Sequence, residues 1–262
     1  MKRTEELHLA SREIFGGLAP SYERTLDLAT LLQDRRWKIW VLDAFKDRGS
    51  RGGRCLDVGC GTLLLEQDRR LPATDVVGLD LSREMLMVGK QKSLPRVALI
   101  EGDAEALPYP ESVFDMVVSM YVAKYVDAER FVRELARVTK PGGVIALYDF
   151  TRPTGLLAPA LGVYVYGALR MAGLLMELAG RAEATTFSKL PGIVRTAYWD
   201  AGLQALMRAN GFSDVKERKF VGGIVHAYSA VRVGDGAVGE CPSLITSGLR
   251  TDTQVAARRP GR

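Results

Sequence analysis

The feature that most constrains the fold is a regular alternation of apolar runs and helical patterns between residues 55 and 150. Parallel strands need crossover connections, and helices supply them, so the alternation predicts a doubly wound, mostly parallel sheet of the α/β class. The predicted strands are residues 55–58, 75–80, 96–103, 114–120 and 144–150. Helices are predicted over 62–70, 82–91 and 127–140, and the hydroxyl of Ser82 suits the N-cap of the second.

The flanking segments are predicted to add helices before this alternation and two strands after it. Residues 1–48 show apolar side chains at helical spacing, and the Gly-Leu-Ala-Pro stretch at 17–20 divides them into two helical pieces. A helix over 197–212, closed by Asn210-Gly211, precedes a final pair of strands, 213–220 and 222–233, expected to be antiparallel. We therefore expect seven strands in one domain over residues 1–232, with an unpacked tail over 233–262.

Composition narrows the classes of function. The chain has 262 residues, a formal net charge of +5 without long runs of like charge, two histidines and three cysteines without a CxxC pair. We therefore expect no metal, no disulfide framework and no nucleic-acid partner. The first residues lack the apolar run of a secretory signal, so a cytoplasmic protein is expected.

An apolar stretch follows the fifth predicted strand. Arg170 and Glu177 interrupt residues 155–180, which leaves less than the run of about 20 apolar residues that a membrane-spanning helix needs. The insert over 151–194 is predicted to be a buried helix or an apolar substrate lid. Peripheral contact with a membrane stays open as an alternative.

The turn after the first strand, CLDVGCGTLLLE (55–66), is typical of a nucleotide-binding loop. Gly59 and Gly61 match the first two glycines of the dinucleotide fingerprint, but Leu64 stands where the third is required. No lysine follows the glycines as in a Walker loop. The loop therefore argues against NAD, FAD and nucleoside triphosphates.

Three carboxylates follow the first three strands closely. Asp80 ends the second strand, where an acid accepts hydrogen bonds from ribose hydroxyls, and Asp103 follows the third, within reach of an adenine amine. Asp57 lies beside the glycine turn and suits an ammonium group. An adenosine with a cationic tail and no phosphate describes S-adenosylmethionine (SAM). The alternative is that these acids are only helix caps or turn residues.

Four segments in order carry a family resemblance: LDVGCGT, VVGLD, GDAEALPYPESVFD and LARVTKPGG. Together they resemble class I SAM-dependent methyltransferases, which have a Rossmann-like sheet. IFGGLAPSYERTLDLATLLQDRRWKIW, YDFTRP and NGF with GGIVHAY narrow the resemblance to the ubiquinone/menaquinone C-methyltransferase-like group, over residues 11–232.

The resemblance implies a set of cofactor-binding residues. Tyr22 is implied to cover the cofactor, Met85 to pack on the adenine, and Ala104 to present its backbone amide to the ring. The remaining implied contacts come from Asp57, Gly59, Gly61, Asp80 and Asp103.

One segment departs from the quinone enzymes. They carry an aromatic-Gly-aliphatic-Arg-Asn segment after the fourth strand, whereas this chain reads MYVAK at 120–124, with Ala123 in the arginine position. Tyr121 and Lys124 are candidates to orient or deprotonate a nucleophile, and the alternative is that both are surface residues of a loop.

The predicted function is SAM-dependent methyl transfer to a small, apolar acceptor such as a quinone or an isoprenoid-lipid precursor. Alternatives are N- or O-methylation of another small molecule and a nonenzymatic SAM-binding module. RNA methylation is disfavoured because the tail carries four arginines against three acids and no aromatic-basic stripe. The sequence does not distinguish a monomer from a homodimer.

Overall fold

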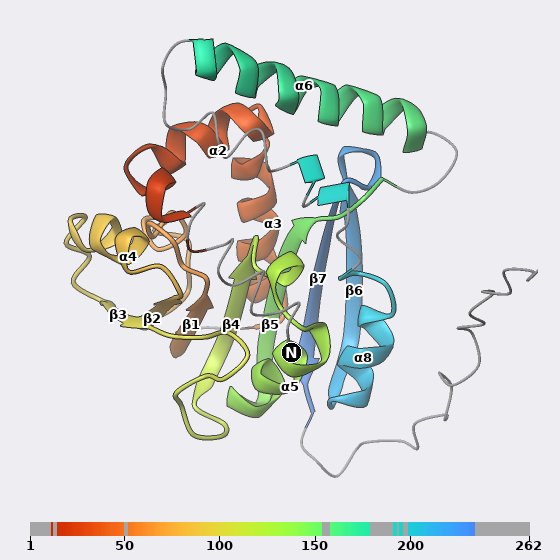
Figure 1. Ribbon diagram of the computed structural model, residues 1–262. Coiled ribbons are helices and arrows are strands. Elements are labelled where there is room, and N and C mark those ends of the chain that lie inside the picture. The colour runs from red at the N-terminus through yellow and green to blue at the C-terminus, as the bar shows by residue number, and fades with distance from the viewer. Residues whose placement is uncertain are drawn as a thin grey trace, which may run out of the picture.

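A single seven-stranded sheet forms the centre of the molecule (Figure 1). The computed structural model describes residues 12, 15–49, 52–153, 158–178, 191–192, 194–195 and 199–233. The strand order is β3-β2-β1-β4-β5-β7-β6, with β1 to β5 parallel and β7 antiparallel to both β5 and β6. This topology confirms the predicted fold class. The strands are β1 (Arg54–Val58), β2 (Asp75–Asp80), β3 (Val97–Glu101), β4 (Phe114–Met120), β5 (Thr139–Phe150), β6 (Phe212–Phe220) and β7 (Val225–Arg232).

Helices cover both faces of the sheet. Trp37, Val41 and Phe45 of α3 pack on one face, and α5 and α8 pack on the other. Both faces are therefore buried, which explains why β4 is an almost continuous apolar run. The helices are α2 (Tyr22–Thr30), α3 (Asp34–Asp47), α4 (Arg83–Lys90), α5 (Ala128–Val138), α6 (Ala158–Leu178) and α8 (Leu203–Ala209), with 3-10 turns at Ala19–Ser21, Ala123–Tyr125 and Val221–Gly223.

Local capping agrees with the sequence at two helix ends. Ser82 caps α4 as predicted, because its hydroxyl accepts a hydrogen bond from the backbone N–H of Met85 at 3.3 Å. Asn210 caps α8 at its end, and Gly211 follows with a φ of 77°. The final two strands are antiparallel, as expected.

The predicted helix over 62–70 is wrong. Residues 61–67 form hydrogen-bonded turns instead, closed by bonds such as Leu63 N–H to the Cys60 carbonyl and Asp68 N–H to the Leu65 carbonyl. Leu63 has a φ of 63°, a left-handed conformation that a regular helix does not contain. Leu63 and Leu65 are nevertheless buried, although the turns do not align the apolar side chains on one helix face.

The N-terminal helices divide differently from the prediction. Residues 15–18 are helical, and a 3-10 turn at Ala19–Ser21 joins them to α2, so the break at 17–20 is only a change of helix type. The main interruption comes at Leu31 and Leu32, whose φ values of 49° and 63° are left-handed. The apolar periodicity runs through this turn, and therefore gives no signal of it.

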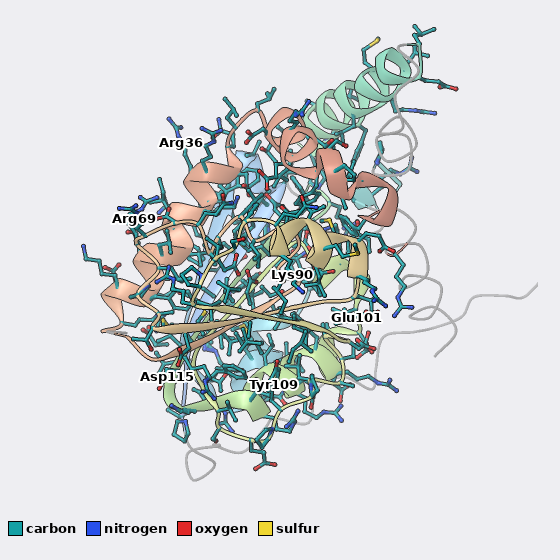
Figure 2. The ribbon with its side chains drawn as sticks, turned by 90° about the vertical axis from the view of Figure 1, so that its left-hand side faces the viewer. Arg36, Arg69, Lys90, Glu101, Tyr109 and Asp115 are labelled. Carbon is teal, nitrogen blue, oxygen red and sulfur yellow. The ribbon has the colours of Figure 1, made fainter. Side chains whose placement is uncertain are left out.

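The carboxyl ends of β4 and β5 point toward α2 and α6, which lie across that end of the molecule (Figure 1). Viewed from the β3 edge, α6 projects away from the sheet, and Lys90 of α4 and Glu101 of β3 lie on the side facing the viewer (Figure 2). Among the helices that the structure describes, none is long and apolar enough to cross a bilayer. Most of the predicted insert after residue 178 and the tail from 234 onward lie outside the described residues.

Candidate functional site

A hollow opens at the carboxyl edge of the sheet, where the strand order reverses between β1 and β4. Open α/β sheets bind ligands at such a reversal. The hollow encloses about 610 Å³, its open mouth included. Its lining is Phe15, Tyr22, Gly59, Gly61, Leu79, Asp80, Leu81, Met85, Gly102, Asp103, Ala104, Met120, Tyr121, Val122, Tyr125 and Val126. It thus brings together every predicted cofactor residue except Asp57.

The two glycines of the turn shape the floor of the hollow. Gly59 has a φ of 79°, and a Cβ atom there would overlap with Cγ2 of Val122. A Cβ atom on Gly61 would lie 3.4 Å from Cε of Met85 and 3.8 Å from the ring of Tyr22. Any side chain at these positions would occupy the space beside the turn. The glycines therefore keep the backbone accessible to a ligand.

Asp80 joins the turn to the next strand. Its carboxylate accepts hydrogen bonds from the backbone N–H groups of Gly61 and Ser82, both at 2.8 Å. Burial raises the pKa of Asp80, and these two hydrogen bonds oppose the shift. The side chain therefore fixes the turn from the end of β2 while also lining the hollow.

The residues predicted to contact an adenine occupy the segment after β3 and the first turn of α4. Asp103 accepts a hydrogen bond from the backbone N–H of Glu105 at 2.8 Å and lines the hollow together with Ala104. Met85 is 3% exposed and borders the same space from α4. These three residues come from two different elements, and the fold brings them together around one hollow.

Tyr22, at the start of α2, also lines the hollow. Its ring packs edge-to-face on Phe15 with centroids 6.1 Å apart, and both rings line the hollow. Glu23, next in the chain, accepts hydrogen bonds from Thr62 at 3.0 Å and from Lys92 at 2.5 Å. These bonds attach α2 to the glycine turn and to the end of α4.

Asp57 lies behind the turn and not in the lining of the hollow. Both of its carboxyl oxygens are buried, and the nearest ionisable group is the carboxyl group of Glu66, within hydrogen-bonding reach. Burial raises the pKa of Asp57 well above its ordinary value, and Glu66 raises it further. Sequence reasoning missed Glu66, because the contact depends on the turns that replace the predicted helix.

A second cavity adjoins the first. It encloses about 480 Å³ and shares Phe15, Tyr22, Tyr121 and Tyr125 with the hollow, so an aromatic wall separates the two spaces. The remaining lining is Leu18, Thr25, Leu26, Ala29, Lys124 and Phe150. Apart from Thr25 and Lys124, these side chains are apolar or aromatic, which suits an apolar acceptor.

Tyr121 is buried and its hydroxyl is engaged. The hydroxyl donates a hydrogen bond to Asp34 Oδ1 at 2.7 Å, and Tyr148 donates to the same oxygen at 2.7 Å. Burial raises the pKa of Tyr121 well above its ordinary value, and the charge of Asp34 adds to this. The φ of 65° is unusual for a side chain of this size. Tyr121 lines both cavities while its hydroxyl is bound to Asp34.

Lys124 forms a buried ion pair with Asp149. Its Nζ atom donates to Asp149 Oδ1 and to the Tyr121 carbonyl, both at 2.7 Å, and lies 4.5 Å from the centroid of the Tyr125 ring. Burial lowers the pKa of Lys124, and the contact with Asp149 opposes the shift. With both Tyr121 and Lys124 only 8% exposed, the alternative that they are surface loop residues is wrong.

Tyr125 and Val122 are pocket residues that had no individual signal in the sequence, whereas Phe15 belongs to the N-terminal segment that carries the family resemblance. Tyr125 follows Tyr121 at a spacing of four, and the 3-10 turn Ala123–Tyr125 returns its ring to the hollow. Among the described residues, no three His, Cys, Asp or Glu side chains cluster in a way that could hold a metal ion.

Comparison with known proteins identifies the family. The family model described as the ubiE/COQ5 methyltransferase family matches residues 1–232. A demethylmenaquinone methyltransferase of Renibacterium salmoninarum is 33% identical over 224 residues, which cover 84% of this chain and 91% of the relative. The ubiquinone/menaquinone biosynthesis C-methyltransferase UbiE of Syntrophotalea carbinolica is 30% identical over 230 residues, covering 85% of this chain and 94% of the relative.

Solved structures show the same fold. A SAM-dependent methyltransferase from Thermotoga maritima superposes with a TM-score of 0.52 at 20% identity, over 84% of this chain and 99% of its own. A protein of Bordetella parapertussis described as a possible exported protein gives a TM-score of 0.56 at 16% identity, over 88% and 94%. The family match and the relatives confirm the predicted enzyme class and its methyl donor, SAM. The chain belongs to the ubiE/COQ5 methyltransferase family.

Proposed function

We propose that this enzyme methylates a ring carbon of a small apolar quinol of the demethylmenaquinone type. Relatives at 33% identity over 84% of the chain carry the name demethylmenaquinone methyltransferase. The structural observation that carries the proposal is the apolar cavity beside the hollow, with a shared aromatic wall of Phe15, Tyr22, Tyr121 and Tyr125. A flat, apolar ring fits between such side chains.

The residues of the hollow fit SAM as its occupant. Asp80 provides carboxylate oxygens for the ribose hydroxyls, and Asp103 with the backbone of Ala104 provides partners for the adenine edge. Met85 provides an apolar surface for the adenine face, and Tyr22 closes the hollow from α2. The side-chain-free turn at Gly59 and Gly61 leaves room for the amino acid moiety.

The sulfonium of bound SAM supplies an already activated methyl group, so the protein mainly has to orient the acceptor and exclude water. Orientation of two reactants can contribute about 7–11 kcal/mol to lowering a barrier. Tyr121 and Phe150 suit this task, because their rings stack with centroids 5.4 Å apart at an interplanar angle of 26°. Lys124 places one ammonium group, balanced by Asp149, in the wall of the acceptor cavity. We propose that this ammonium orients an acceptor oxygen.

A second candidate function is N- or O-methylation of another small molecule. The observation that favours it is Ala123, which is 7% exposed and offers only a methyl group where the quinone enzymes resembled by the sequence carry arginine. Lys124 does not replace that arginine in geometry, because its ammonium is held by Asp149.

Transfer of labelled methyl groups tests both functions. The full chain is incubated with methyl-labelled SAM and a panel of reduced demethylnaphthoquinols, phenols and amines of similar size. The proposal expects label on a quinol ring carbon, in a form that resists acid and base. Label only on phenols or amines would support the second candidate, and absence of label from every quinol would contradict the first.

We also propose that α6 contacts a membrane surface, from which an isoprenoid quinol would be taken. Val163, Met171, Leu174 and Leu178 are 51–77% exposed and their spacing places them along one side of this helix. Leu174→Glu with Leu178→Glu should abolish co-sedimentation with lipid vesicles. Met87→Glu on α4, where Met87 is 60% exposed, is the matched control. Equal sedimentation of the wild type and the α6 variant would contradict the contact.

We further propose that the protein is cytoplasmic and that residues 1–232 form a single domain. The acceptor is a small molecule, and no nucleic-acid partner is expected.

A further inference from the structure

A single buried carboxylate holds two tyrosine side chains in the interior. Asp34 lies in the first turn of α3, and its Oδ1 atom accepts hydrogen bonds from the hydroxyls of Tyr121 and Tyr148, both at 2.7 Å. Its Oδ2 atom forms an ion pair with Lys38 Nζ at 2.5 Å. Burial raises the pKa of both tyrosines, so their hydroxyls stay protonated and donate. The positive end of the helix dipole also favours a carboxylate at this place.

Asp34 lines neither cavity, but one of its two tyrosines lines both. Tyr121, directly after β4, belongs to the aromatic wall between the hollow and the second cavity. Tyr148, on β5, lies behind this wall and lines neither space. The two hydrogen bonds to Asp34 are equal in length, and they differ in whether the ring that they fix borders a cavity.

The backbone of Tyr121 is left-handed, with a φ of 65°. A side chain of this size adopts that conformation only where its surroundings fix it from several sides. Its N–H donates to the Tyr148 carbonyl at 3.0 Å, and its carbonyl accepts from Lys124 Nζ at 2.7 Å. The ring stacks on Phe150 with centroids 5.4 Å apart and meets Tyr148 edge-to-face at 5.1 Å. The bond to Asp34 fixes the remaining end of the side chain, the hydroxyl.

The Tyr121 ring is therefore a flat and fixed part of the wall of the second cavity. Aliphatic side chains such as Leu18 and Leu26 line other parts of this cavity. An aromatic face makes offset-stacked or edge-to-face contacts with another flat ring, and a globular apolar molecule cannot make them. A ring that turned freely would adapt to either shape, so the selection of shape depends on the bond that fixes the ring.

We propose that Asp34 is a positioning residue for the acceptor, and that the Tyr121 ring that it fixes makes the cavity select a flat aromatic acceptor over a globular one of equal size. Asp34 acts through Tyr121 and touches neither ligand. The inference rests on the proposed function, because it takes the second cavity as the acceptor site. It extends that function by assigning the choice of acceptor shape to a contact between α3 and the segment after β4.

Binding of two probes tests the inference without turnover. 1-Naphthol is flat and 1-adamantanol is globular, and the two molecules have the same number of heavy atoms. Calorimetry of the full chain in the presence of S-adenosylhomocysteine gives the ratio of the two affinities. The wild type should bind 1-naphthol more tightly. Tyr121→Phe and Asp34→Asn should each lower this preference by about three- to tenfold, the range of one hydrogen bond, and the double variant should lower it no further.

Tyr148→Phe is the matched control. It removes a hydrogen bond of the same length to the same oxygen of Asp34, but from a residue that lines neither cavity. Its preference for 1-naphthol should therefore stay close to that of the wild type. An equal loss of preference in Tyr148→Phe would reduce Asp34 to structural support and overturn the inference. A wild type that binds both probes equally, or binds neither, would overturn it as well.

Tyr121→Gly keeps the inference testable if Asp34→Asn does not fold. Glycine adopts a φ of 65° without strain, and it removes the ring, so the preference for 1-naphthol should disappear. A preference that survives in this variant would overturn the inference.

The transfer of labelled methyl groups judges the proposed function separately. Methylation of a quinol by the wild type, together with an unchanged probe preference in Tyr121→Phe, would overturn only the inference. A lowered preference in that variant, without methylation of any quinol by the wild type, would overturn only the proposed function.

Discussion

The hollow and the cavity beside it are built in different ways, although they share four aromatic residues. The hollow is lined at the ends of β1, β2 and β3 by glycines and carboxylates, among them Gly59, Asp80 and Asp103. The cavity takes much of its lining from the N-terminal helices, and its charged side chain, Lys124, is neutralised by Asp149.

Under the proposed function, this difference separates recognition of the cofactor from recognition of the acceptor. The backbone turns that line the hollow stand at the ends of sheet strands. Side chains of α2 and the segment after β4 can be exchanged without changing the strands. The departure at Ala123 falls in the 3-10 turn after β4, next to Lys124 of the second cavity, and leaves the glycine turn unchanged.

The largest expected effect is on the acceptor side. Lys124→Met leaves Asp149 buried without its partner and should lower the free energy of unfolding by about 3–5 kcal/mol. Urea unfolding of the two proteins measures the difference. Lys124→Met combined with Asp149→Asn should recover most of the loss, because no buried charge is left unpaired. A loss below about 1 kcal/mol, the range of a surface ion pair, would contradict the burial of this pair.

A smaller effect is expected on the cofactor side. Asp80→Ala removes a carboxylate that holds Gly61 and Ser82 and is proposed to bind the ribose, so affinity for S-adenosylhomocysteine should fall by about 1.5–3 kcal/mol. Asp75→Ala, at the exposed opposite end of β2, is the matched control and should change affinity little. Equal affinities of the two variants by calorimetry would show that the hollow does not bind the nucleoside.

Tyr121→Phe tests whether the Tyr121 hydroxyl takes part in the reaction or only stabilises the wall between the two cavities. The change removes the hydrogen bond to Asp34, and we expect about 1–2 kcal/mol of lost stability because the acceptor is charged. The turnover rate should change only severalfold, with an unchanged pH profile. A general base would instead contribute about 10²–10⁴-fold to the rate, so a loss of that size with an altered pH profile would identify Tyr121 as catalytic.

The smallest effect concerns the attachment of α2 over the hollow. Burial would raise the pKa of Glu23, but hydrogen bonds from Lys92 and Thr62 outweigh it and lower the pKa below 4.5. The stabilisation is therefore complete above that pH and is lost as the pH falls through the lower folded-state pKa. Glu23 is 43% exposed, so solvent screening limits the effect to about 0.5 kcal/mol.

Glu23→Gln should therefore unfold at slightly lower urea than the wild type at pH 7, and the two midpoints should converge as the pH falls through the lowered pKa of Glu23. A difference that does not change with pH would mean that the charge of Glu23 does not contribute.

The sequence predicted the features that depend on local pattern. The order of strands and helices, the Ser82 cap and the residues around the glycine turn follow from periodicity, capping chemistry and motif spacing. Contacts between distant segments could not be predicted in this way. Tyr121 reaches Asp34 across 87 positions of the chain. The meeting of Asp57 with Glu66 depends on turns where the apolar pattern indicated a helix.

The residues with left-handed backbone conformation could not be predicted from local sequence pattern either. Leu31, Leu32, Leu63 and Tyr121 adopt positive φ values, although their side chains are not typical of that conformation. Packing of the neighbouring elements imposes the backbone geometry at these positions, and propensity does not reveal it. Two of these positions adjoin the second cavity: Tyr121 lines it, and Leu31 follows its lining residue Ala29 by two positions. The shape of this cavity could therefore not be predicted from the sequence.

We propose that the two adjoining spaces bind two different ligands, the cofactor and the quinol. A crystal structure of the enzyme with S-adenosylhomocysteine and a reduced demethylnaphthoquinone analogue tests this arrangement. We predict that the nucleoside lies along Asp80 and Asp103, and that the quinol ring lies between Tyr22, Tyr121 and Phe150 with its unmethylated carbon facing the sulfur. A quinol bound outside the cavity, or a nucleoside bound away from the glycine turn, would contradict this arrangement of the two ligands.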